Sequence, residues 1–74
     1  MNQSEVARLR EQIESQLQAM QQGLRGLSSG TARHAFIQAR MKRIGQYQDE
    51  LAQQVGEQEA DQVLWRLYAG VMEQ

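Results

Sequence analysis

Apolar residues in the first third of the chain recur at the spacing of an α-helix. Steps of three and four put them on one helical face, so the segment is predicted to be a helix that buries one stripe. Two successive steps of four interrupt the heptad, which argues against a long regular coiled coil. Ser4 is placed to cap a helix over about residues 4–25. The stripe consists of Val6, Leu9, Ile13, Leu17, Met20, Leu24 and Leu27.

Glycine dominates the stretch that follows this first helix. Gly23, Gly26 and Gly30 crowd it, and they predict a turn centred on residues 27–30. Ser29 or Thr31 is expected to cap the next helix.

The second helix is expected over about residues 31–55, because apolar residues return at heptad-like spacing. Gln48 interrupts them, and Gly56 is a plausible carboxy-terminal cap, with a kinked continuation as the alternative. The stripe consists of Ile37, Met41, Ile44, Leu51 and Val55.

A third helix, over about residues 57–72, has apolar residues on two faces. One face comprises Ala60, Val63, Leu64, Leu67 and Val71. The other face is formed by Trp65, Tyr68 and Met72. Either the wide stripe fills a three-helix core, or the second face contacts a partner, since these residue types are common at interface centres.

The fold class is therefore predicted to be all-α: an antiparallel helical hairpin (about 4–25 and 31–55) plus a third helix, completed by oligomerisation. Folding the chain about residue 29 pairs Leu17 with Met41 and Ile13 with Ile44. The same register brings opposite charges together. It sets Arg8 and Arg10 towards Asp49 and Glu50, and Glu11 and Glu14 towards Lys42 and Arg43.

Length and composition favour a chain that needs a partner. The 74 residues form a single small helical domain, 1–74. A core of this size rarely contributes more than about 3–5 kcal/mol of net stability. There is no cysteine and one histidine, so disulfides are excluded and neither a metal nor a cofactor is expected. With no signal peptide and no apolar run that could span a bilayer, a cytoplasmic protein without membrane contact is expected.

Catalytic constellations are missing from the sequence. His34 has no obvious partner, and no Gly-rich phosphate loop or metal-protease motif occurs. We therefore expect no enzymatic activity.

Charge is divided along the chain. Residues 15–48 hold five arginine or lysine residues and no acid, whereas residues 49–74 hold six acids and one arginine. Within the basic part, five residues step by three and four and form an arginine–aromatic ribbon beside the apolar stripe. The ribbon consists of Arg33, Phe36, Arg40, Arg43 and Tyr47.

The ribbon has two physical interpretations. Arginines neutralise phosphate and aromatics stack on bases, which favours a nucleic acid. Arginine stems also cover the edge of a core, with cation–π contacts to Phe36 or Tyr47, and the low isoelectric point of about 5.7 fits this interpretation better.

The leading hypothesis is a protein–protein interaction module, either a homo-oligomer with a dimer favoured or an accessory subunit of a larger assembly. Trp65, Tyr68 and Met72 are its predicted interface. The alternative is a nucleic-acid-binding accessory protein that uses the arginine–aromatic ribbon.

Overall fold

Three α-helices form the chain in the computed structural model, which describes residues 3–26 and 30–73. They are α1 (Gln3–Gly26), α2 (Thr31–Val55) and α3 (Glu57–Met72). No strand occurs among the described residues. The predicted all-α class is confirmed. The bounds of the second and third helices are as predicted, and the first is one residue longer at each end.

The predicted helix caps are partly wrong. Helix α1 begins before Ser4, which therefore lies inside it, and Thr31 is already the first residue of α2. The cap of α2 is Gly30, which has no side chain to offer, while Ser29 lies outside the described residues. Gly56 is confirmed as the carboxy-terminal cap of α2, and its N–H donates to the carbonyl oxygen of Ala52 at 2.8 Å.

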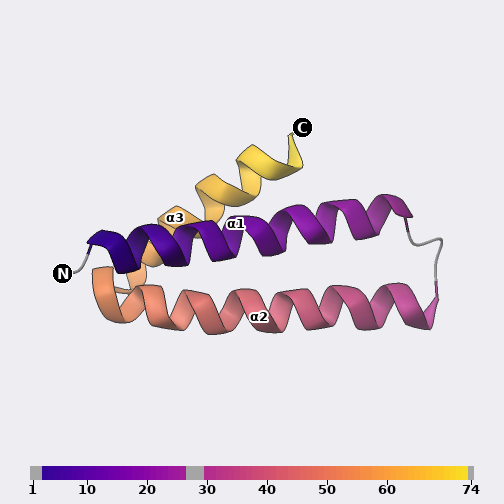
Figure 1. The fold of residues 1–74 in the computed structure, drawn as a ribbon, viewed down its shortest axis with the longest axis horizontal. Coiled ribbons are helices and arrows are strands. Elements are labelled where there is room, and N and C mark those ends of the chain that lie inside the picture. The colour runs from indigo at the N-terminus through magenta and orange to yellow at the C-terminus, as the bar shows by residue number, and fades with distance from the viewer. Residues whose placement is uncertain (1–2, 27–29, 74) are drawn as a thin grey trace.

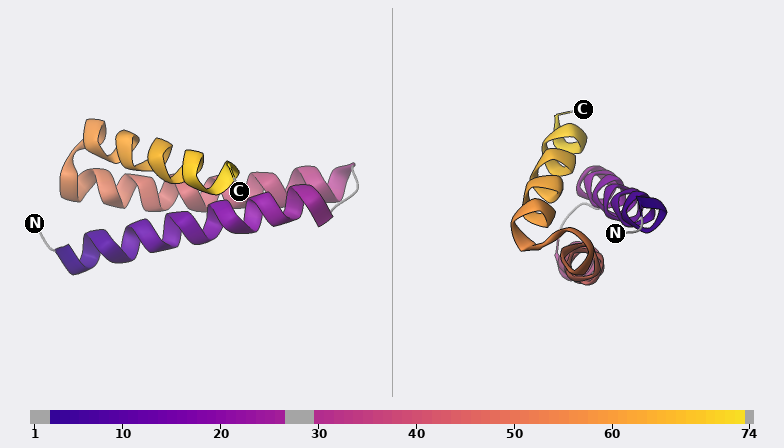
Figure 2. Two further views of the ribbon diagram at one scale, coloured as in Figure 1. Left: turned by 90° about the horizontal axis from the view of Figure 1, so that it is seen from above. Right: turned by 90° about the vertical axis from the view of Figure 1, so that its left-hand side faces the viewer.

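Helices α1 and α2 run antiparallel, side by side, and confirm the predicted hairpin (Figure 1). Helix α3 folds back from the end of α2 and packs against both of them (Figure 2). It has 16 residues, against 24 in α1 and 25 in α2. At 1.5 Å per residue it extends for about 24 Å along a hairpin of about 37 Å. One end of the hairpin is therefore left uncovered.

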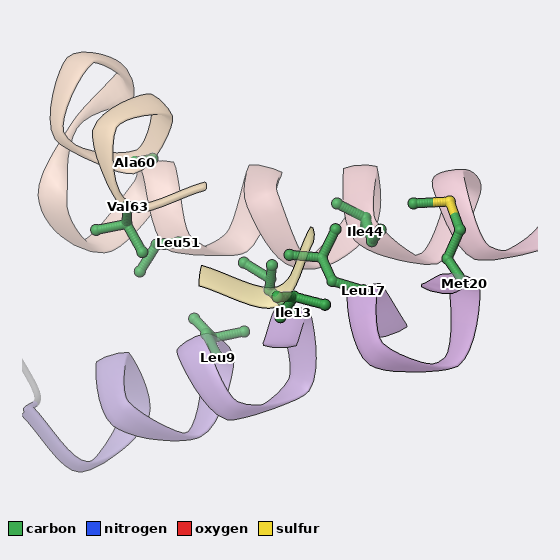
Figure 3. Packing of buried hydrophobic residues seen from close by; sticks show 9 residues of the cluster. Leu9, Ile13, Leu17, Met20, Ile44, Leu51, Ala60 and Val63 are labelled. Carbon is green, nitrogen blue, oxygen red and sulfur yellow. The ribbon is translucent and has the colours of Figure 1, made fainter. Parts of the chain in front are cut away.

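The core lies where all three helices meet. Figure 3 shows Leu9 and Leu17 of α1 pointing towards α2. Each predicted stripe contributes to this core, although α2 contributes only two buried residues, Ile44 and Leu51. No charged or polar side chain among the described residues is fully buried. The buried residues are Leu9, Ile13, Leu17, Met20, Ile44, Leu51, Ala60, Val63 and Val71.

Two glutamine side chains connect α3 to the hairpin, one near each end of the helix. Gln48 Nε2 on α2 donates to Asp61 Oδ1 at 3.2 Å. Gln21 Nε2 on α1 donates to the carbonyl oxygen of Val71 at 2.7 Å. Helix α3 thus starts against α2 and ends against α1, moving away from α2 as it proceeds (Figure 1). Gln48 interrupts the apolar stripe because it anchors α3.

Met41 corrects the predicted core. It was expected to pack in the hairpin opposite Leu17, yet 59% of its surface is exposed, and Leu24 is 37% exposed. Both residues lie towards the uncovered end of the hairpin. Their exposure follows from the short third helix, because no described segment of the chain covers them.

The predicted charge pairing between the hairpin helices is only partly correct. Arg8 forms an ion pair with Glu5 on its own helix, and this hydrogen bond raises the pKa of Arg8 and lowers that of Glu5. The charge of Glu50 on α2 adds to the rise, as the register predicts. Glu11 and Glu14 instead line a hollow beside Leu67 of α3.

Within the described part of the chain, therefore, neither acid pairs with Lys42 or Arg43. The reason is rotational: Glu11 and Glu14 lie on the flank of α1 that faces α3, not α2.

Gly56 sets the direction of α3, and its replacement tests the fold. Its φ of 91° and ψ of 158° lie in a region that is open essentially to glycine alone. Gly56→Ala is expected to lower the free energy of unfolding by about 1–3 kcal/mol, measured by urea denaturation. Alanine also favours a continuous helix, so α3 should dissociate from the core.

The control for this change is Gly70→Ala on the same helix, where an added Cβ meets no atom and φ is not positive. It should instead raise stability by about 0.5–1 kcal/mol. Equal effects of the two changes would contradict a glycine-dependent turn.

Candidate functional site: an apolar groove between α2 and α3

A groove opens where α3 moves away from α2. Its volume is about 560 Å³. Its lining is almost entirely apolar, and residues from all three helices contribute. They are Leu17, Met20, Leu24, Ile37, Met41, Ile44, Gly45, Gln48, Leu64, Trp65, Tyr68 and Met72.

One wall of the groove is the second apolar face of α3, the predicted interface. Trp65 is 64% exposed and Tyr68 is 42% exposed, while Met72 is half-buried and packs against the core. The Trp65 and Tyr68 rings meet edge to face, with centroids 5.7 Å apart and planes at 77°. Such an edge-to-face contact is favourable beyond the area that it buries. The structure brings all three predicted residues together.

The opposite wall and the floor were not predicted to belong to the site. Met41 and Gly45 of α2 form the wall, and Leu17, Met20 and Leu24 of α1 lie along the floor. The sequence assigned Met41 and Leu24 to the core because their spacing fits the stripe. One signal could have identified Met41 and Leu24 as groove residues: the third helix is shorter than the two helices of the hairpin.

Among the described residues, no neighbour of Gly45 requires a glycine at this position. It lies in the interior of α2, and a Cβ added to it would meet no atom within 4 Å beyond the neighbouring backbone of its own helix, as is also true of Gly26 and Gly70. Glycine in a helix interior costs about 0.5–1 kcal/mol relative to alanine. Gly45 thus lowers the stability of α2, although no contact with a described residue requires a glycine there. Glycine is also the residue that allows another backbone to approach closely.

The arginine–aromatic ribbon lies on the other flank of α2, against α1. The Phe36 ring lies so close to Gly23 that a Cβ there would overlap it. Tyr47 packs against the core. The Arg40 guanidinium lies over the Phe36 ring, 5.4 Å from its centroid, within cation–π range.

The five ribbon residues therefore differ in how far they are buried and in the contacts that they make. Phe36 and Tyr47 pack within the fold, and Arg40 Nε is buried with no hydrogen-bond partner among the described residues. Arg33 is half-buried, and Arg43 is exposed. An aromatic ring that packs between helices has little face left for stacking on a base. Phe36, Arg40 and Tyr47 thus make their contacts within the fold.

Other kinds of site find little support in the described residues. No group of three or more His, Asp or Glu side chains among them is arranged to hold a metal ion. No helix within the described ranges combines the length and the apolarity that a membrane span requires. Comparison with protein-family models, curated proteins and solved structures finds no significant match to the chain.

A double-mutant cycle tests whether Arg40 acts within the fold. Phe36→Leu removes the ring, and Arg40→Met keeps most of the stem but removes the charge. Because the guanidinium lies over the ring, the two changes should be coupled by about 0.5–1 kcal/mol in the free energy of unfolding. Additive effects would show that Arg40 and Phe36 do not interact.

Proposed function

We propose that this protein is a non-enzymatic protein–protein interaction module that assembles with a second copy of itself through the apolar groove. The observation that carries the proposal is the groove itself, with Trp65 and Met41 largely exposed on opposite walls. Exposed tryptophan, tyrosine and methionine around a concave apolar surface are characteristic of interface centres. A dimer is the simplest closed assembly of this kind.

The free energy available from covering the groove is substantial for a chain of this size. Full burial of one large apolar side chain is worth about 1.5–3 kcal/mol. The free energy gained by covering Trp65, Tyr68 and Met41 is thus comparable to the net stability of a small core, which is about 3–5 kcal/mol. Association would stabilise the fold as well as form the complex.

Charge favours a second copy as the partner. The uncovered part of the hairpin lies at its turn end, within the stretch that holds five basic residues and no acid. Acids are concentrated at the other end, in the last turns of α2 and the start of α3, where Asp49, Glu57 and Asp61 lie. A second copy in antiparallel orientation would set its acidic end against the basic end of the first.

The alternative of a nucleic-acid-binding accessory protein receives weaker support. Of the ribbon residues, Arg43 is fully available, whereas both aromatic rings pack within the fold. Binding of single-stranded RNA that weakens steeply with salt, and further on Arg43→Ala, would favour this alternative. Service as an accessory subunit of a larger assembly, and a cytoplasmic location, remain predictions.

Trp65→Ala tests the proposal. The wild-type chain should sediment as a dimer at micromolar concentration, and the variant should dissociate at least tenfold more readily, because interface tryptophans often contribute 2 kcal/mol or more. Sedimentation velocity over a concentration series measures this.

The control is Arg66→Ala, an exposed neighbour on α3 that does not line the groove. It should leave the dimer unchanged. If Trp65→Ala remains fully associated and only unfolds more easily, Trp65 has no role in association.

A further inference from the structure

We propose that the two copies meet by an antiparallel crossing of α2 on the α2 of the second copy, centred between Gly45 and Gln46. This inference rests on the proposed self-association and adds its geometry. Two features of α2 carry it: a glycine that no described neighbour requires, and two opposite charges, three residues before and four residues after that glycine.

Gly45 marks the point of closest approach. It lines the groove, and open space surrounds the position where a Cβ would lie. A glycine in the interior of a helix also lowers the stability of that helix. Small residues at a crossing point allow two helix backbones to approach closely. A helix seated over Gly45 would also cover Met41, whose side chain is largely exposed on that wall.

Lys42 and Asp49 give the crossing its register. They lie three residues before and four residues after Gly45, so all three share one face of α2. Both are exposed, and within residues 3–26 and 30–73 neither forms an ion pair. In an antiparallel two-fold pair centred between Gly45 and Gln46, residue 42 of one chain faces residue 49 of the other. Lys42 of each copy then faces Asp49 of the other, twice by symmetry.

The aromatic wall of α3 fits the same arrangement. Trp65 and Tyr68 border the groove opposite Gly45 and Met41. If α2 of the second copy lies over Gly45, it therefore also lies alongside the Trp65 and Tyr68 rings of the first copy. Each copy would contribute one α2 and one aromatic wall, so both grooves are covered by a single self-complementary contact.

Exchange of the two charges tests the register. Lys42→Glu and Asp49→Lys, each alone, create two like-charge contacts in their own homodimer. Each should weaken self-association by about tenfold. When the two variants are mixed, both contacts of the mixed dimer are opposite in charge, so a heterodimer should form with near wild-type affinity. Native mass spectrometry of the mixture, with one variant isotope-labelled, measures the three species.

The outcomes separate this geometry from the wider proposal. Preferential heterodimers support the crossing at Gly45. A wild-type dimer with statistical mixing of the variants would overturn the crossing but leave self-association in place. A wild-type chain that stays monomeric throughout the concentration series would overturn both. If the chain binds another protein but not a second copy of itself, both proposals would likewise be overturned.

Gly45→Ala provides an independent test. Alanine favours the helix and meets nothing within the chain, so the variant should unfold at a higher urea concentration under conditions where it is monomeric. The added methyl group should nevertheless weaken dimerisation by about tenfold, because the two helices can no longer approach as closely.

The matched control is Gly70→Ala, also helical, exposed and without neighbours, but outside the groove. It should stabilise the monomer and leave the dimer unchanged. Equal dimer affinities for the two variants would contradict a close approach at Gly45.

Discussion

The length of the third helix is the constraint on which the rest of the structure depends. A hairpin of two helices of 24 and 25 residues has one long apolar face, and α3, with 16 residues, covers only part of it. Gly56 fixes where α3 begins, and the hydrogen bonds of Gln48 and Gln21 fix its path from α2 towards α1. A wedge between α2 and α3 is the geometrical result. The groove is thus a consequence of the same contacts that close the core.

The two flanks of α2 serve different purposes. On the flank that faces α1, Phe36 packs against Gly23 and carries the Arg40 guanidinium, so polar and aromatic groups are used within the fold. On the flank that faces α3, Met41 and Gly45 have few neighbours. An apolar flank without neighbours tends to acquire them through association, because its burial is favourable and the fold does not provide it.

The sequence predicted the helices and the hairpin well, because both follow from local patterns. Steps of three and four in the apolar positions, together with Gly56, were enough to bound α2 and α3 to the residue. The path of α3 over the hairpin, and the side chains that it covers, were harder to predict. Met41 has the spacing of a core residue, yet only the path of α3 decides whether it is covered. Glu11 and Glu14 were assigned to α2 by register alone, and a small rotation of α1 turns them towards Leu67.

The candidate site shows the same division between local and tertiary information. Trp65, Tyr68 and Met72 were predicted as one face because they share a helix, and they do lie together. Gly45 and Leu24 were not predicted to line the groove, because this depends on which surface α3 leaves open. A glycine inside a helix that no internal contact requires is destabilising for the isolated chain. It can persist without loss where folding and association are coupled, since a partner that binds only the folded chain adds its binding free energy to the stability of the fold.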